Sequence, residues 1–328
     1  MQKTTFQSKS RVSNLSPGTT FTGKWNRNPY QIIKKLGNGA NGTVYLVATR
    51  LGERAIKIGE NKMSLTSEVN VLKHFSSLGQ HTLCPVLLDV DDLEIAGETY
   101  PFFCMEYLHG DSLLSFTRKK GQEWVPILLV QLLGDLDRFH QAGWVFGDLK
   151  PDNIIVTGPP MRVRLFDVGG TTKMGRSIKE YTEFYDRGYW GLGDRKADVG
   201  YDLFAVAMMF IETVYPHRFQ KASQKKQHLD DLMEKVTSAS SLRPYKKVIY
   251  RALTGKYSDA QWMKKEIMTV IEKGSTSQAV SSKRRSRPVS GRSNGIKEKK
   301  KPSYRTELAL TGSFLFLSSI LYLVGQII

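Results

Sequence analysis

The stretch FGDLKPDN at residues 146–153 carries three polar side chains at a fixed spacing: Asp148, Lys150 two residues on, and Asn153 five residues on. An aspartate can orient and deprotonate an attacking hydroxyl, a lysine can neutralise charge on a transferring phosphoryl group, and an asparagine can hold a metal ion. The spacing therefore favours phosphoryl transfer. Asp-x-x-x-x-Asn also occurs by chance in polar surface turns, so this motif indicates phosphoryl transfer only together with other motifs of the sequence.

A second carboxylate and a glycine-rich turn accompany this loop. Asp167 opens the tripeptide Asp-Val-Gly and follows the apolar run 163–166, which predicts a short strand that brings a further metal ligand to the same place. Residues 37–44, GNGANGTV, lie between two β-branched segments and predict a hairpin with a glycine-rich turn. Glycines lack Cβ, so the backbone N–H groups of such a turn can approach phosphate oxygens. A lone G-x-G-x-x-G is as often an ordinary tight turn.

The next predicted strand, residues 54–58, places Lys57 on its inward face. A buried lysine needs a partner anion. Glu68 lies in a helical pattern with Val69 and Leu72 and can supply that anion. The sequence therefore predicts a buried ion pair close to the glycine-rich turn.

Together these residues resemble the bacterial Ser/Thr protein kinases of eukaryotic type, the Hanks-type kinases, over about residues 28–272. The match extends to residues 105–108, which resemble the gatekeeper and hinge. It also includes Asp202, which resembles the buried aspartate that anchors the catalytic loop from the central helix of the large lobe. The resemblance implies ATP and Mg²⁺ as cofactors and protein hydroxyls as substrates.

Each site residue takes an expected role from this resemblance. Asp148 would be the catalytic base and Lys150 the transition-state cation, which is typical of Ser/Thr rather than tyrosine kinases. Asn153 and Asp167 would hold Mg²⁺, and Lys57 would bind the α- and β-phosphates while paired with Glu68. The residues expected to surround ATP are Gly37, Asn38, Gly39, Ala40, Asn41, Gly42, Val44, Ala55, Lys57, Glu68, Met105, Glu106, Leu108 and Ile155.

The chain departs from the family pattern at several points. Phe146-Gly147 stands where the family has His-Arg, so the arginine that clamps an activation-loop phosphate is missing. Val168 replaces the usual phenylalanine, and we expect Phe146 to fill the vacated volume in one apolar stack with Leu72. No clear Ala-Pro-Glu precedes the central helix, and the arginine that pairs with that glutamate is also missing, because Tyr257 falls near its place.

Two other functions remain open at this point. The Gly-Asp pair at residues 147–148 also resembles the His-Gly-Asp loop of aminoglycoside and choline kinases, which are small-molecule phosphotransferases. A non-catalytic tether that binds DNA or lipid is the third interpretation. Lys150, the Asp-Val-Gly element and the glycine-rich turn favour a protein substrate, and the intact polar residues argue against a tether.

Composition fits one catalytic domain with appendages. The chain has 328 residues, and its two cysteines, Cys84 and Cys104, lie far apart in apolar contexts, which argues against disulfides and favours a reducing compartment. Residues 1–10 carry no apolar run, so we expect no signal peptide. Residues 1–25 are rich in Ser, Thr, Asn and Lys and are expected to form a flexible leader.

The C-terminal 21 residues, 308–328, contain no charged residue. At about 1.5 Å rise per residue they would span roughly 30 Å as a helix, the hydrocarbon thickness of a bilayer. We expect a single-pass C-terminal anchor in the cell membrane, and the positive-inside rule then leaves the catalytic domain in the cytoplasm. A long buried core helix is the alternative.

Residues 275–306 are filled with Ser, Gly, Lys and Arg and are expected to form a disordered basic linker. Ten basic residues against Glu298 give this segment +9 of the total +17. That exceeds what a topology signal needs, so we expect contact with DNA by counterion release or with anionic lipid. The basic residues are Lys283, Arg284, Arg285, Arg287, Arg292, Lys297, Lys299, Lys300, Lys301 and Arg305.

This architecture resembles the YabT-type sporulation kinases of spore-forming bacteria. The resemblance implies a membrane kinase that binds DNA through its basic segment, is stimulated by it, and autophosphorylates by transient self-association when copies share one polyanion. Candidate modification sites between Asp167 and Tyr189 are Thr171, Thr172, Ser177 and Thr182.

The expected fold is therefore α+β: a two-lobed kinase-like domain with an antiparallel sheet and one helix in the small lobe and a mainly helical large lobe. Residues 127–139 predict a long buried helix and 203–214 a central one. The expected boundaries are 1–25 for the leader, 26–106 and 107–274 for the lobes, 275–306 for the linker, and 307–328 for the transmembrane helix.

Overall fold

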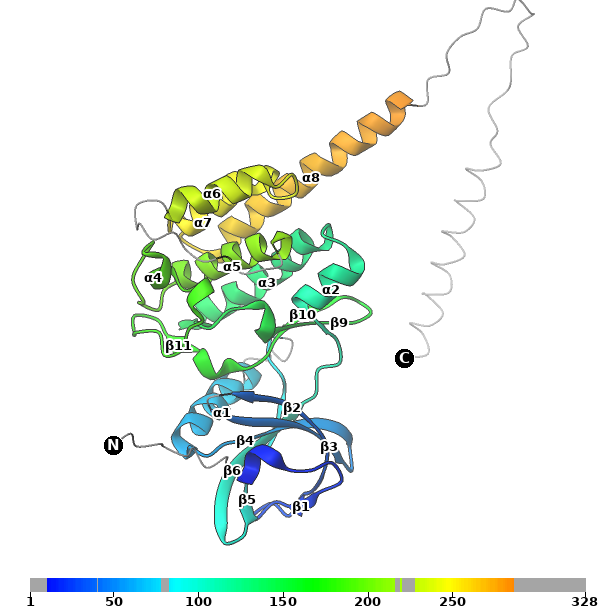
Figure 1. The fold of residues 1–328 in the computed structure, drawn as a ribbon, viewed down its shortest axis with the longest axis vertical. Helices are drawn as coiled ribbons and strands as arrows, with labels where there is room; N and C mark the ends of the chain where they lie inside the picture. The colour runs from blue at the N-terminus through cyan, green and yellow to red at the C-terminus, as the bar shows by residue number, and fades with distance from the viewer. Residues whose placement is uncertain (1–10, 40, 78–82, 216–218, 220–227, 286–328) are drawn as a thin grey trace, which may run out of the picture. The chain divides into compact units, whose positions relative to one another are not determined.

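The computed structural model describes residues 11–39, 41–77, 83–215, 219 and 228–285. The chain divides into two units, residues 1–278 and 279–328, and the description below concerns the first. That unit has a sheet-rich lobe with one helix and a helical lobe, as expected from the sequence (Figure 1). The α+β, two-lobed arrangement is thus confirmed.

The small lobe is built on one antiparallel sheet of six strands in the order β1-β2-β3-β4-β6-β5. The central strands are buried on both faces: Ala55 and Phe103 belong to one apolar cluster, whereas Ile56, Phe102 and Cys104 belong to another. The single helix of the lobe, α1, spans Lys62–Ser77 and buries Leu65, Val69 and Leu72, which are spaced to share one helical face. The strands are β1 Thr20–Thr22, β2 Pro29–Gly39, β3 Gly42–Thr49, β4 Gly52–Ile58, β5 Leu87–Ile95 and β6 Glu98–Glu106.

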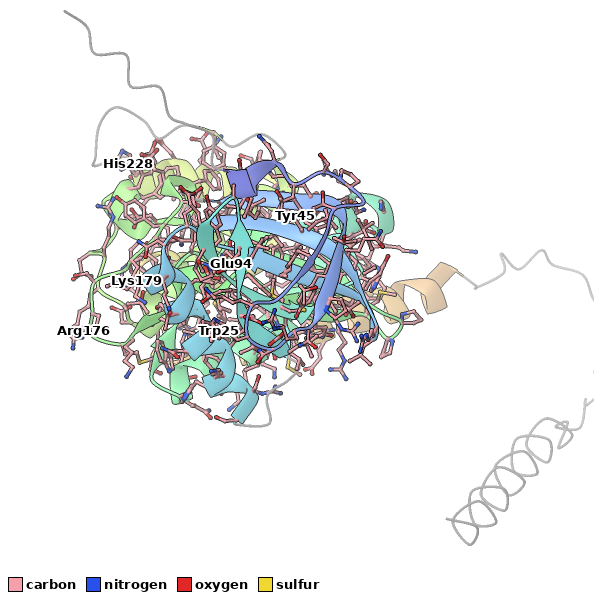
Figure 2. All side chains as sticks on the ribbon, turned by 90° about the horizontal axis from the view of Figure 1, so that it is seen from below. Trp25, Tyr45, Glu94, Arg176, Lys179 and His228 are labelled. Atoms are coloured by element: carbon pink, nitrogen blue, oxygen red, sulfur yellow. The ribbon has the colours of Figure 1, made fainter. Side chains whose placement is uncertain are left out.

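The part of the expected leader that the structure describes is packed against this sheet. Residues Arg11–Asn14 form a 3-10 turn, η1, and Val12 is buried. The Tyr45 hydroxyl donates to the Val12 carbonyl at 2.7 Å, and the Trp25 N–H donates to Asp91 (Figure 2). The expectation of a flexible leader therefore fails for residues 11–25, because a few apolar side chains in a polar context are enough to cover the sheet.

The large lobe is mainly helical, with short strands near the small lobe (Figure 1). The predicted helices at 127–139 and 203–214 lie within α3 and α5, and nearly every residue of α5 is buried. Its helices are α2 Leu113–Lys120, α3 Trp124–Gln141, α4 Arg187–Trp190, α5 Val199–Val214, α6 His228–Ser238, α7 Lys246–Leu253 and α8 Ala260–Arg285, with 3-10 turns η2 Pro151–Asn153, η3 Val168–Gly170, η4 Glu183–Tyr185 and η6 Arg243–Tyr245.

Short strands fix the loops that carry the polar motifs. Strands β7, β9 and β10 form a three-stranded sheet, and β8 pairs with β11. The predicted strand before Asp167 is β10, which leads directly into that residue. Their bounds are β7 Asp111–Ser112, β8 Trp144–Val145, β9 Ile154–Thr157, β10 Arg162–Leu165 and β11 Thr172–Lys173.

Helix α8 continues to Arg285, so residues 275–285 are helical where the sequence suggested a disordered linker. Residues 275–285 contain no Gly or Pro, and net charge alone does not prevent a helix. Most of the basic linker and the apolar segment 307–328 lie outside the described residues. Among the helices of the described part, none is long and apolar enough to cross a bilayer.

Candidate active site

A cleft of about 520 Å³ lies between the two lobes, beneath the β2–β3 hairpin. It brings together residues that are up to 130 positions apart, from Gly37 in the hairpin to Asp167 after β10. Of the residues expected to surround ATP, those that line this cleft are Gly37, Asn38, Gly39, Gly42, Val44, Ala55, Lys57, Glu68, Met105, Glu106, Leu108 and Ile155. Asn41 lies at the rim, as described below, and Ala40 lies outside the described residues.

The predicted buried ion pair is present at the back of this cleft. The Lys57 ammonium on β4 lies 2.6 Å from Glu68 Oε1 on α1 and 3.1 Å from Asp167 Oδ1. Burial acts to lower the pKa of Lys57, but the two carboxylates outweigh it and raise that pKa. Burial also raises the pKa of Glu68 to about 7, although Lys57 opposes the shift. The Lys57 ammonium thus links strand β4 to helix α1 through Glu68 and to the candidate metal ligand Asp167.

The catalytic loop forms a second cluster of polar contacts. Lys150 Nζ contacts Asp148 Oδ2, and the Asn153 amide donates to the Asp148 carbonyl at 2.9 Å. The Thr182 hydroxyl donates to Asp148 Oδ1 at 2.9 Å and lies 3.1 Å from Lys150 Nζ. A hydroxyl from another chain that took the place of Thr182 would meet the same acceptor and the same cation.

Asp202, at the start of α5, holds this loop from below. Its carboxylate is fully buried and accepts the backbone N–H groups of Phe146 at 2.8 Å and Gly147 at 3.0 Å, while His140 Nε2 lies 3.0 Å from it. A buried carboxylate that accepts several hydrogen bonds is rigid and well satisfied. This is the anchoring position that the resemblance assigned to Asp202.

The donor set at Asn153 and Asp167 fits Mg²⁺. The Asn153 amide nitrogen is directed at Asp148, which leaves its Oδ1 as an acceptor, and the Asp167 side chain is about half exposed toward the cleft. Mg²⁺ usually takes one or two protein oxygens and completes its octahedron with phosphate oxygens and water. Among the described residues no group of three or more His, Cys, Asp or Glu could hold a metal by itself.

The glycine-rich turn needs glycine for a steric reason. Gly42 has φ +141°, and a Cβ there would lie 2.4 Å from the Ile58 carbonyl oxygen of the neighbouring strand. The chain therefore passes close to β4 and leaves the hairpin tip over the cleft. At that tip, the Asn41 side-chain amide donates to Glu180 Oε1 at 2.6 Å. This contact ties the glycine-rich turn to the segment that follows Asp167.

The departures at Phe146 and Gly147 have a structural explanation. Phe146, Val168 and Leu72 are all buried and belong to the same large apolar cluster, and a stack of the three stays a prediction. Gly147 has φ +84°, and a Cβ there would lie 2.7 Å from the Gly170 carbonyl oxygen. Any side chain would meet that backbone, so an arginine clamp cannot occupy this position without moving the chain.

The segment between Asp167 and α4 is instead held by unmodified residues. Residues 175–178 run antiparallel to 195–197, with backbone hydrogen bonds such as Ile178 N–H to the Arg195 carbonyl at 2.9 Å. The Lys179 ammonium reaches the Ser67 hydroxyl on α1 and the Thr171 carbonyl, each at 3.2 Å (Figure 2). These contacts join the segment to both lobes.

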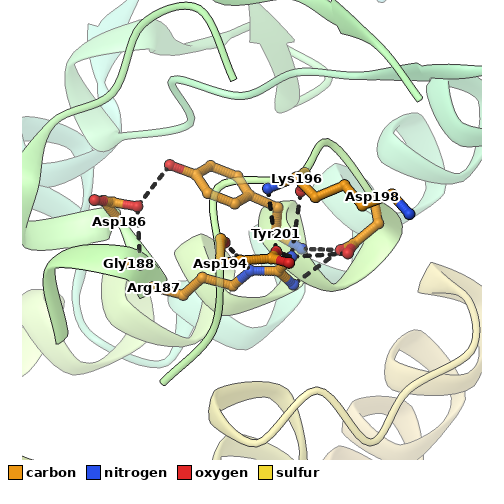
Figure 3. Close-up of polar contacts among 7 residues, drawn as sticks. All are labelled: Asp186, Arg187, Gly188, Asp194, Lys196, Asp198 and Tyr201. Carbon is orange, nitrogen blue, oxygen red and sulfur yellow. Dashed lines mark hydrogen bonds and ion pairs between the residues drawn. The ribbon is translucent and has the colours of Figure 1, made fainter. Parts of the chain in front are cut away.

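A buried carboxylate at Asp186 anchors the end of this segment (Figure 3). Asp186 caps α4 by accepting the N–H groups of Gly188 and Tyr189, and it also accepts the Tyr201 hydroxyl at 2.9 Å. The Arg195 guanidinium pairs with the same carboxylate at 2.7 Å. An ion pair between two residues nine positions apart in the sequence thus lies in the region where the family's Ala-Pro-Glu and its arginine are missing.

The candidate modification sites differ in access. Thr171 and Thr172 are fully buried, and the Thr172 hydroxyl donates to the Gly170 carbonyl. Thr182 is engaged by Asp148 and Lys150. Ser177 is exposed. In this conformation only Ser177 of the four presents its hydroxyl to solvent.

Sequence reasoning missed four residues that shape the site: Lys179, Glu180, Asp186 and Arg195. They lie in irregular segments without periodicity, and the only available signal was the charge of the run 179–187 near the missing motif. Glu106 also acts differently from the simplest expectation. Its side chain is paired with Arg164 at 2.8 Å.

Comparison with known proteins agrees with this geometry. The protein kinase domain family matches residues 30–282. The chain is 52% identical over 266 residues to the serine/threonine-protein kinase YabT of Bacillus subtilis (strain 168), which covers 80% of this chain and 78% of that protein. It is 31% identical over 157 residues to the serine/threonine-protein kinase SBK2 of Rattus norvegicus, covering 46% of this chain and 42% of that protein.

A more distant relative is the serine/threonine-protein kinase PknG of Mycobacterium leprae, 24% identical over 174 residues, which cover 50% of this chain and 22% of that protein. All three relatives are protein kinases by name. Neither a small-molecule phosphotransferase nor a non-catalytic tether finds support in them. The chain therefore belongs to the protein kinase family, as a Hanks-type serine/threonine protein kinase.

Proposed function

We propose that this kinase uses ATP and Mg²⁺ and transfers the γ-phosphoryl group to Ser or Thr hydroxyls of protein substrates and of its own chain. One observation carries the assignment of roles. In the cleft Lys57 contacts both Glu68 and Asp167, and in the catalytic loop Asp148 contacts Lys150 while its backbone carbonyl accepts the Asn153 amide. These are the groups that position a nucleotide and stabilise the charge that develops during transfer.

In the proposed reaction, Asp148 accepts the proton of the attacking hydroxyl as the new O–P bond forms and the bond to the β-phosphate oxygen breaks, with ADP as the leaving group. Lys150 neutralises charge on the transferring group, and Lys57 holds the α- and β-phosphates. Asn153 and Asp167 would hold Mg²⁺. When bound, the ion supplies positive charge to the phosphate oxygens.

Phosphate transfer from radiolabelled ATP tests these roles, with a generic protein, an aminoglycoside and no added substrate as three parallel samples. We expect label on protein only. Asp148→Asn should lower turnover by about 10²–10⁴-fold, the usual contribution of a general base, with an unchanged melting temperature. Asp194→Asn is the matched control, at an exposed aspartate that does not line the cleft. Equal activity of Asp148→Asn and the control would refute the assignment.

We also propose that the basic segment binds DNA and that DNA stimulates the kinase. The support is the +9 charge of residues 275–306 and the likeness to YabT. Activity should rise with DNA at low salt and the rise should vanish as salt increases, because binding of this kind releases counterions. Replacing the ten basic residues with alanine should abolish the rise. If DNA still stimulates that variant as it does wild type, the proposal is rejected. If the variant loses binding to anionic lipid vesicles but keeps binding to DNA, the segment is a lipid-binding segment.

A membrane anchor and a role in sporulation complete the proposal. The uncharged stretch 308–328 supports a single span with the kinase in the cytoplasm. The chain should sediment with membranes and resist alkaline extraction, and deletion of residues 308–328 should release it. Spore yield of cells that carry Asp148→Asn, compared with wild type, tests the physiological role.

A further inference from the structure

The segment 238–258 contains five basic residues and no acidic residue. It comprises η6, α7 and the turn that follows, all within the described kinase domain and separate from the basic linker. Its basic residues are Arg243, Lys246, Lys247, Arg251 and Lys256. This segment was not part of any motif that assigned the kinase activity.

Helix α7 directs these charges outward. Its apolar residues Val248, Ile249, Ala252 and Leu253 are buried and fix the rotation of the helix. Lys246 and Lys247 are consequently exposed, as is Tyr250 one turn on. The surface positions are therefore set by packing.

Four of the five cations have no carboxylate partner among the described residues. Arg251 is paired with Glu266. Arg243 has a different restraint, because its Nε donates to the Thr237 carbonyl at 3.0 Å and holds the guanidinium beside α6. We define the α7 patch as Arg243, Lys246, Lys247, Lys256 and Tyr250.

The patch borders a groove between α6 and α7. The groove has a volume of about 570 Å³, and its lining residues are Asp230, Met233, Arg243, Pro244, Lys246, Lys247 and Tyr250. Asp230 is the one carboxylate in this lining, so the three basic residues leave it positive. The Lys256 ammonium lies 4.9 Å from the centre of the Tyr250 ring and adds a fourth cation next to the phenol.

We propose that the α7 patch is a second contact surface for nucleic acid, placed on the folded kinase domain. The inference takes its class of partner from the proposed DNA binding of the linker and adds a surface to it. Charge complementarity carries the argument. The patch cations lie at both ends of α7: Lys246 and Lys247 begin the helix, Arg243 precedes it in η6, and Lys256 follows it. The helix extends about 12 Å, which corresponds to about four phosphates of one DNA strand at a spacing of about 3.4 Å along the axis.

The shape of the surface favours a rod-like polyanion over a flat bilayer. A groove can receive one strand of a duplex backbone, whereas peripheral membrane binding usually rests on protruding apolar side chains next to basic ones. The Tyr250 hydroxyl adds a donor for a phosphate oxygen, which is a common phosphate contact. Contacts of this type position the protein on DNA and carry no sequence specificity.

The test measures binding of the detergent-solubilised full chain to a fluorescent duplex between 50 and 300 mM salt. The patch variant is Arg243→Gln, Lys246→Gln, Lys247→Gln and Lys256→Gln. The matched control removes four exposed charges from the small lobe: Lys34→Gln, Arg50→Gln, Lys62→Gln and Lys73→Gln. Melting temperature and ATP turnover without DNA should be the same for both variants.

We expect the slope of log K against log salt to decrease in magnitude by about 3 to 4 in the patch variant, because each phosphate contact contributes about 0.9. Between 50 and 200 mM salt, wild type should then lose about 100-fold more affinity than the patch variant. The control should keep the wild-type slope to within about 1. Equal slopes for patch and control variants overturn the inference.

The linker variant of the previous section separates this inference from the proposed function. If only the linker variant loses salt dependence of DNA binding, the proposal that the linker binds DNA stands and the α7 patch is rejected. Loss in the patch variant alone supports the patch and rejects the linker. If the patch variant keeps its DNA slope but binds less to vesicles with anionic lipid, the surface belongs to the membrane and the inference fails.

Discussion

Replacing Asp186 by alanine should destabilise the large lobe, because this buried carboxylate anchors the end of the segment between Asp167 and α4. The carboxylate is fully buried and serves four donors at once: two backbone N–H groups of α4, the Tyr201 hydroxyl and the Arg195 guanidinium. Alanine removes all four acceptor contacts and leaves the Tyr201 hydroxyl buried without its partner.

The magnitude follows from these contacts. Loss of a helix N-cap costs about 1 kcal/mol, and a buried hydroxyl left unsatisfied costs about 1–3 kcal/mol. Arg195 is partly exposed and can turn to water, so its bond adds little more. The expected loss is about 2–4 kcal/mol in the free energy of unfolding, which for a domain of this size lowers the melting temperature by about 10 °C.

Thermal and urea unfolding, followed by tryptophan fluorescence, measure this loss. Trp190 is a built-in reporter, because its indole N–H donates to the Phe184 carbonyl in the same segment. Asp194→Ala is the matched control, since Asp194 pairs with Arg187 in the adjacent network but is exposed (Figure 3). We expect no measurable shift for it. A melting temperature of Asp186→Ala within about 3 °C of wild type would refute the reasoning that this carboxylate anchors the segment.

Three further predictions concern the cleft and its loops. Burial raises the pKa of Glu68 to about 7, so the folded state retains a proton that the unfolded state releases near pH 4.5. The stability that this proton confers should be lost as pH rises, so the melting temperature should fall from pH 5 to 7. Glu68→Gln should remove this dependence of the melting temperature on pH. Gly147→Ala should cost at least about 1–2 kcal/mol in unfolding experiments for a left-handed non-glycine residue, and an unaltered urea midpoint would contradict the clash with Gly170. Lys179→Met should raise KM for ATP while leaving the melting temperature unchanged, because it frees α1 from the segment; a fall in kcat alone would argue against that link.

The chemical residues could be predicted from the sequence because each sits in a regular context. Lys57 lies on a strand rich in apolar residues, Glu68 lies on an amphipathic helix, and Asp167 follows a strand. Such elements fix where a side chain points. The structure accordingly brings Glu68 and Asp167 within hydrogen-bond distance of Lys57.

The parts that sequence reasoning missed depend on long-range contacts of irregular chain. The pairing of residues 175–178 with 195–197 has no local signal, since neither stretch forms a named strand. Asp186 reads as one more charged residue of a polar run, and only the fold places it in a fully buried position. Residues 11–25 were misjudged for the same reason, because Val12 is buried by a sheet that lies elsewhere in the sequence.

These missed contacts bear on how the kinase is controlled. A phosphate bound to an arginine of the catalytic loop could order the segment after Asp167, but Gly147 leaves no room for that arginine. The segment is instead ordered by Lys179, Glu180 and the Asp186–Arg195 pair, none of which needs modification. Order in the segment is thus independent of phosphorylation in this conformation. The proposed binding of the basic surfaces to DNA would offer a different means of control, because a shared polyanion raises the local concentration of one kinase molecule around another.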